Sequence, residues 1–119
     1  MAQNEVYKYA DWVSVPVAAA DTATVSGVKG VSGNPIRVGG LNGAIQVSNG
    51  DGSNAEGWVS VSFTGAWHFT VTGALTFGQA VYITSAGALT ATATDNDLFG
   101  YALSEKGAGS GRAIVRVDN

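Results

Sequence analysis

The sequence contains no cysteine, which excludes disulfide bonds, thiolate metal sites and thiol nucleophiles. Only 13% of its 119 residues are charged, and the formal net charge is −3. A chain with this balance lacks the basic patch that nucleic-acid binding requires. Long apolar runs are also missing, since the longest, Val15–Ala20, is far too short to span a membrane. We therefore expect no cofactor and no nucleic-acid or membrane partner.

Histidine is scarce too, with His68 as the single example. It shares one face of a predicted strand with Thr70 and Thr72, which is the face expected to meet solvent or a partner. No serine lies in the Gly-x-Ser-x-Gly elbow of the α/β-hydrolases. These observations predict that the protein is not an enzyme.

Two polar segments invite a metal-site interpretation. The segment that begins at Asp95 resembles the start of a calcium loop, but Phe99 and Lys106 occupy positions where that loop needs ligands. The turn-rich loop Asn49–Gly57 is predicted to be exposed and polar. Weak cation binding by its side chains is the alternative, and the groups concerned are Asp51, Ser53 and Glu56.

The pattern that dominates the chain is an alternation of apolar and polar residues with a period of two, typical of half-buried strands. It recurs in about eight to ten short segments joined by glycine-rich turns, and no segment has a helical period of useful length. The pattern predicts an all-β protein built as a small barrel or sandwich of short antiparallel strands. The clearest segments are Trp12–Val17, Ile36–Val38, Leu41–Ser48, Trp58–Phe63, Ala66–Thr72, Ala80–Thr84, Ala88–Thr94, Leu98–Leu103 and Arg112–Val117.

The stretch from Phe77 to Val117 holds four of these segments in succession. We interpret it as a β-meander against which the rest of the chain packs. One of its strands should place Phe99, Tyr101 and Leu103 on one face. The final strand should turn both of its arginines outward, and these are Arg112 and Arg116.

The chain is predicted to comprise an N-terminal arm, residues 1–10, and a single β domain, residues 11–119. The first residues lack the basic and apolar regions of a signal peptide. Tyr7 and Tyr9 lie in the arm, which is expected to be poorly ordered unless it docks on a partner. Pro16 cannot donate a ladder hydrogen bond, so the first strand is predicted to be an edge.

Exposed aromatic side chains are the remaining candidates for function. Trp12 and Trp58 fall on strand faces opposite the valines. They either cover an open end of the core or anchor a partner, since tryptophan is enriched in interface hot spots.

Several turn-and-strand motifs together resemble a known family of short tailed-phage head proteins, the capsid decoration or cement proteins. The resemblance extends from about Trp12 to Val117 and contains no chemical signature. The motifs are Gly39-Gly40-Leu41 before an Ile45-x-Val47 strand, GQAVYIT, the small-residue run from Gly87, Asp97-Leu-Phe-Gly-Tyr-Ala-Leu, and Arg112-Ala-Ile-Val-Arg-Val.

The resemblance implies a small β-barrel or β-tulip-like domain, commonly trimeric, bound to the outside of the mature icosahedral head. Its partner would be the major capsid protein, and the chain would be made in the host cytoplasm and end in the virion. The candidate capsid contacts are Tyr7, Tyr9 and Trp12, and the other interface candidates are Trp58, Arg112 and Arg116.

A second interpretation also fits the residues, namely a carbohydrate- or receptor-binding β-domain of a phage fibre or an adhesin. In that case Trp58 and Trp67 would act as stacking platforms.

Overall fold

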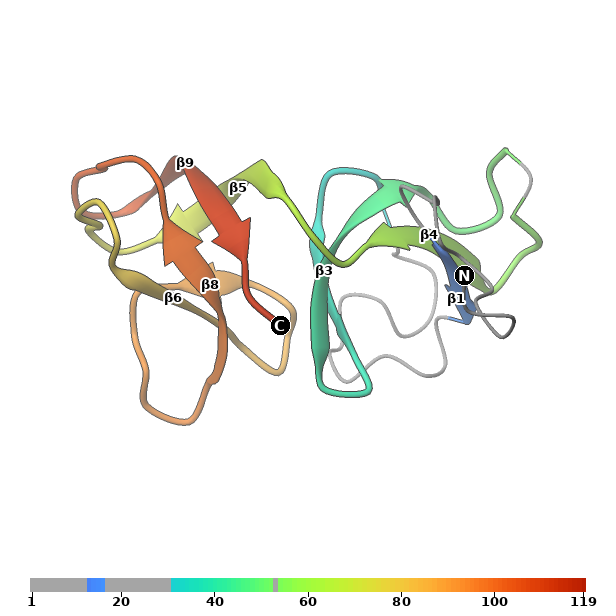
Figure 1. The fold of residues 1–119 in the computed structure, drawn as a ribbon, viewed down its shortest axis with the longest axis horizontal. Coiled ribbons are helices and arrows are strands. Elements are labelled where there is room, and N and C mark those ends of the chain that lie inside the picture. The colour runs from blue at the N-terminus through green and yellow to red at the C-terminus, as the bar shows by residue number, and fades with distance from the viewer. Residues whose placement is uncertain (1–12, 17–30, 53) are drawn as a thin grey trace, which may run out of the picture.

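The computed structural model describes residues 13–16, 31–52 and 54–119 (Figure 1). These residues form nine β-strands, and they contain no helix, hence none long and apolar enough to cross a membrane. The predicted all-β class is confirmed. The strands divide into two units that lie side by side, a four-stranded sheet and a closed barrel (Figure 1).

The sheet comprises β1 (Val13–Pro16), β2 (Pro35–Val38), β3 (Leu41–Val47) and β4 (Trp58–Ser62). Its strand order is β1-β4-β3-β2, and every pair is antiparallel. Among the described strands β1 lies at an edge of the sheet, as its proline predicts, and Pro16 lies opposite Trp58.

The barrel comprises β5 (Ala66–Thr72), β6 (Ala80–Ile83), β7 (Leu89–Thr90), β8 (Asp97–Ala102) and β9 (Ser110–Val117). Its order is β5-β7-β6-β8-β9, and the antiparallel pairing of β5 with β9 closes the ring. The pairing of β5 with β7 is parallel, unlike all the others.

The predicted meander is wrong, because β6 lies between β7 and β8 and β5 joins the ring. The predicted strand Ala88–Thr94 is reduced to β7, which has two residues. Beyond it, local bonds replace the ladder: Thr90 Oγ1 accepts from Thr92 N, and Asn96 Nδ2 donates to Thr92 O. Threonine and asparagine commonly compete with the sheet in this way.

A β-bulge in β8 overturns the predicted face of that strand. The partner of Val81 is Gly100 and that of Tyr82 is Leu98, so Phe99 is an extra residue in the strand. The bulge shifts the alternation, so that the core receives Phe99 and Ala102 while Tyr101 is only half-buried. Gly100 is required here, since a Cβ would collide with the Arg116 carbonyl oxygen.

Each unit has its own apolar core. In the barrel, the rings of Phe69 and Phe99 meet edge to face, with centroids 5.5 Å apart. The sheet core is smaller; its buried members are all aliphatic, namely Ile36, Ile45, Val59 and Val61, and Phe63 packs against them while partly exposed. The barrel core consists of Phe69, Val71, Leu75, Val81, Ile83, Leu89, Phe99, Ala102, Ala113, Val115 and Val117, joined by Ala44 from the sheet.

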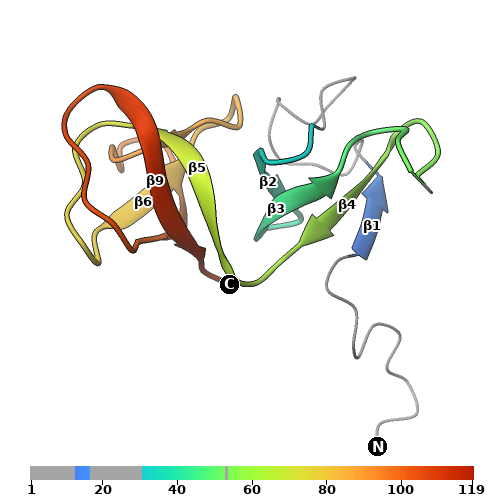
Figure 2. The ribbon, with the colours of Figure 1, turned by 90° about the horizontal axis from the view of Figure 1, so that it is seen from above.

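The contribution of Ala44 shows how the units meet. It lies on the face of β3 opposite Ile45 and packs into the barrel core, so the sheet turns that face toward the barrel. Figure 2 shows the two units diverging from the segment that joins β4 to β5. The expectation that the whole chain packs on the C-terminal stretch therefore holds only in part, because the sheet also packs on a core of its own.

Candidate interaction surfaces

The predicted arm contacts, Tyr7, Tyr9 and Trp12, lie outside the described residues. The described chain begins with β1, immediately after them, and β1 pairs only with β4 among the described strands. In the sequence the arm therefore precedes a strand that lies at the end of the described sheet, and the backbone groups of such a strand can pair with a partner.

Trp58 opens β4, and 42% of its surface is exposed. It borders a shallow cleft of about 270 Å³, formed with Ser14, Asn54 and Ala55. Part of the Trp58 side chain is therefore accessible to a partner beside β1.

Asn54 organises the loop beside this cleft. Its Oδ1 accepts from Ser14 Oγ and Ser60 Oγ, each at 3.1 Å, and its Nδ2 donates to the carbonyls of Val47 and Ser48, each at 3.3 Å. Ser60, which donates one of these bonds, is buried. The four bonds engage both the oxygen and the nitrogen of the Asn54 amide, the groups that a sugar ligand in this cleft would need.

The second predicted stacking platform is wrong. Trp67 packs against the barrel core, and its Nε1 donates to the Thr64 carbonyl at 2.9 Å. Among the described residues, no group of three or more histidine, aspartate or glutamate side chains could hold a metal ion. Of the loop residues named as weak cation ligands, Ser53 lies outside the described residues. Asp97 instead forms an ion pair with Arg37 at 3.6 Å.

Arg112 and Arg116 both point outward from β9, as predicted. Across the ladder, Arg112 lies opposite Thr70 and Arg116 lies opposite Ala66. We name the outward surface of β5 and β9 the arginine face. It carries no carboxylate, and its polar side chains are His68, Thr70, Thr72, Ser110, Arg112 and Arg116.

A cleft of about 330 Å³, which we name the interunit cleft, separates the sheet unit from one end of the arginine face. Residues 33–35 form its wall on the sheet side, and the turn at residues 87–89 closes part of the barrel side. The polar groups that β5 and β9 present to it are Thr70, Thr72, Ser110 and Arg112.

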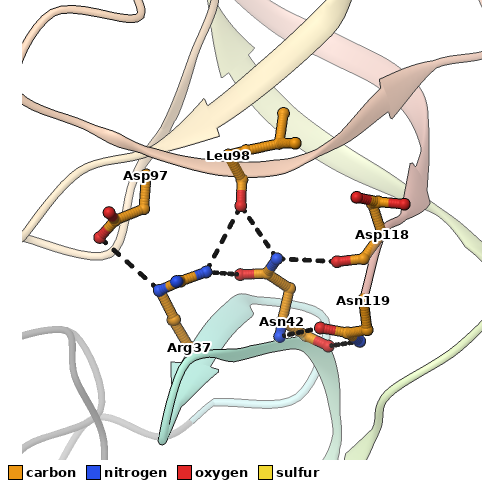
Figure 3. A network of polar contacts seen from close by, with 6 residues as sticks. All are labelled: Arg37, Asn42, Asp97, Leu98, Asp118 and Asn119. Atoms are coloured by element: carbon orange, nitrogen blue, oxygen red, sulfur yellow. Dashed lines mark hydrogen bonds and ion pairs between the residues drawn. The ribbon is translucent and has the colours of Figure 1, made fainter.

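A polar network, which we name the clamp, joins the two units elsewhere (Figure 3). Its centre is Asn42, which is 3% exposed and donates from Nδ2 to the carbonyls of Leu98 and Asp118, each at 2.9 Å. Asn42 Oδ1 accepts from Arg37 Nη1 at 2.8 Å. Asn119 Oδ1 accepts from Asn42 N at 2.7 Å, and Asn119 Nδ2 donates to the Asn42 carbonyl at 2.8 Å.

The sequence analysis did not identify the clamp. The sequence does contain one indication of it, because Asn42 lies within the apolar strand Leu41–Ser48 and a buried amide needs hydrogen-bond partners. Phe77 was also missed, although it is 69% exposed. It sits in a fixed turn, with Gln79 N donating to Thr76 O at 3.1 Å and Gly78 N donating to Ala102 O at 2.7 Å.

The chain matches a known protein family. The model of a family described as phage cement protein matches residues 15–117, which span both the sheet and the barrel. No curated protein and no solved structure matches the chain.

Proposed function

The chain belongs to the phage cement protein family, and from this membership we propose that it binds the outer surface of a phage capsid and stabilises the mature head. The family places it among the structural proteins of the virion. Its partner in this proposal is the major capsid protein. The observation that carries the proposal is the family match across both units of the fold.

In this proposal, the N-terminal arm attaches the protein to the shell. The arm precedes an edge strand, and an extended segment there can add a strand to a partner sheet. Tyr7, Tyr9 and Trp12 would then contact pockets on the capsid protein, with Trp58 exposed on the neighbouring strand. Ordering the arm costs about 1–2 kcal/mol per residue, so a single arm binds weakly.

Self-association, most simply as a trimer, compensates for this weakness, because linked arms raise one another's effective concentration. Exposed apolar side chains such as Leu41 and Phe77 supply surface for contacts between copies. Light scattering checks the oligomeric state both in solution and after release from heads.

Removal of residues 1–9 tests the attachment. The shortened chain should retain its thermal melt and oligomeric state but lose binding to expanded heads, measured by co-sedimentation against the full-length chain. Full occupancy by the shortened chain would show that the arm is not the anchor. Failure of the full-length chain to bind any expanded head would contradict the proposed function itself.

We expect no enzymatic activity, and His68→Ala should leave head binding unchanged, because this exposed side chain is not among the residues that line the interunit cleft. The carbohydrate-binding alternative now depends on Trp58 alone, beside a cleft whose amide groups are already bonded. Glycan binding that disappears in Trp58→Ala would support that alternative.

A further inference from the structure

We propose that the interunit cleft receives a carboxylate-bearing segment of the major capsid protein, and that Arg112 pairs with the carboxylate. The inference rests on the capsid binding proposed above and identifies a second contact, distinct from the arm. Four observations lead to it: the lining of the cleft, the distribution of charge, the fixed walls and the size.

The lining is suited to an anion. The Arg112 guanidinium is accompanied by the hydroxyl groups of Thr70, Thr72 and Ser110, and none of the described residues that line the cleft is acidic. Guanidinium and hydroxyl groups donate hydrogen bonds to carboxylate oxygens, and the charged bonds are the stronger ones. The described lining of the cleft thus offers several hydrogen-bond donors and no carboxylate that would compete with the ligand.

The distribution of positive charge points to Arg112 and to Arg116, which lies on the same strand. The described residues contain four lysines and arginines, and two of these are already engaged. Arg37 pairs with Asp97, and Lys106 Nζ donates to the carbonyls of Gly73, Gly107 and Gly109 at 2.6–2.8 Å. Arg112 and Arg116 have no such partner among the described residues, so the available positive charge of this part of an acidic chain lies on the arginine face.

The walls of the cleft are held by the clamp. β2 begins at the cleft with Pro35 and reaches the clamp at Arg37, and β9 leads from Arg112 toward Asp118. Because both walls are tied together beyond the cleft, a segment can enter without the cost of ordering the site. The volume of about 330 Å³ suits one or two residues of such a segment rather than a folded domain.

The test compares two arginines on the same strand and face. Arg112→Gln should weaken binding to expanded heads about tenfold, the loss expected for a charged hydrogen bond, and Arg112→Glu should weaken it further. The matched control Arg116→Gln lies outside the cleft lining and should change binding less than about twofold. Binding by the unmodified chain should fall with added salt, and binding by Arg112→Gln should fall less steeply.

The possible outcomes distinguish an error in the cleft inference from an error in the proposed function. If the unmodified chain decorates heads and Arg112→Gln decorates them equally well with the same salt dependence, the inference is wrong while the proposed function stands. If Arg112→Glu changes the oligomeric state in solution, the cleft serves contacts between copies and the inference is also wrong. If the unmodified chain binds no heads, both fail together. Thermal melts verify folding of each variant, since both arginines are exposed.

Discussion

The sheet and the barrel differ in whether their strands are paired on both sides. The barrel closes on itself through the pairing of β5 with β9, so each of its strands has a neighbouring strand on both sides. The sheet ends in β1, a four-residue strand with a single described partner strand. A closed ring protects against pairing with other chains, whereas an open edge permits it.

The apolar cores of the barrel and the sheet also differ in size and composition. The barrel encloses an aromatic pair and a ring of aliphatic side chains, whereas the fully buried part of the sheet core is limited to isoleucine and valine. We propose that the barrel supplies most of the stability, whereas the sheet edge and the interunit cleft supply the contacts with a partner. Three substitutions test this division.

Phe99→Ala should have the largest effect. The side chain is fully buried and stacks edge to face on Phe69, so truncation should lower the free energy of unfolding by about 3–5 kcal/mol. Chemical denaturation measures this loss. Hydrogen exchange should show that the sheet amides lose protection together with those of the barrel, because Ala44 packs into the barrel core.

Phe77→Ala is the matched control, because Phe77 lies in the turn before β6 and is 69% exposed. It should change the free energy of unfolding by less than about 0.5 kcal/mol. A Phe99→Ala loss as small as this would mean that the barrel core does not dominate stability.

The barrel core was largely predictable from the sequence, because a period of two reports which side chains share a face. The inward positions of Phe69, Val71 and Val115 follow from it directly, and so do the outward arginines of β9. Pro16 likewise predicted the edge, since the restriction lies in the residue itself.

Strand order and the joint between the units were not predictable in this way. The parallel pairing of β5 with β7 brings together segments that no turn connects, so local pattern carries no signal for it. The bulge at Phe99 resets the alternation within a single strand. The contacts of Asn42 lie 56 and 76 residues further along the chain, so its role emerges only from the fold.

Asn42→Ala should have the second-largest effect. It leaves the carbonyls of Leu98 and Asp118 without their donor in a buried site, which costs about 1–3 kcal/mol. Exchange should accelerate at the joint more than inside either core. The control is Asn34→Ala, an exposed asparagine whose side chain makes no hydrogen bond among the described residues, and it should alter stability by less than about 0.5 kcal/mol. Equal effects of the two variants would remove the clamp as the element that joins the units.

Asp97→Asn should have the smallest effect, although it removes the ion pair between the units. The Arg37–Asp97 distance is 3.6 Å, and the Asp97 side chain is 67% exposed, so solvent screens the attraction and the loss should stay below about 1 kcal/mol. Arg37 keeps its hydrogen bond to Asn42, which does not depend on the carboxylate.

Denaturation at low and high salt measures the Asp97→Asn loss, which should shrink as salt is added. Asp95→Asn is the control in the same turn, because asparagine tolerates its positive φ of 61°. A loss in Asp97→Asn larger than that in Asn42→Ala would mean that charge, rather than a buried amide, holds the sheet to the barrel. In that case the walls of the interunit cleft would loosen with salt, and the weaker head binding expected at high salt could no longer be assigned to Arg112 alone.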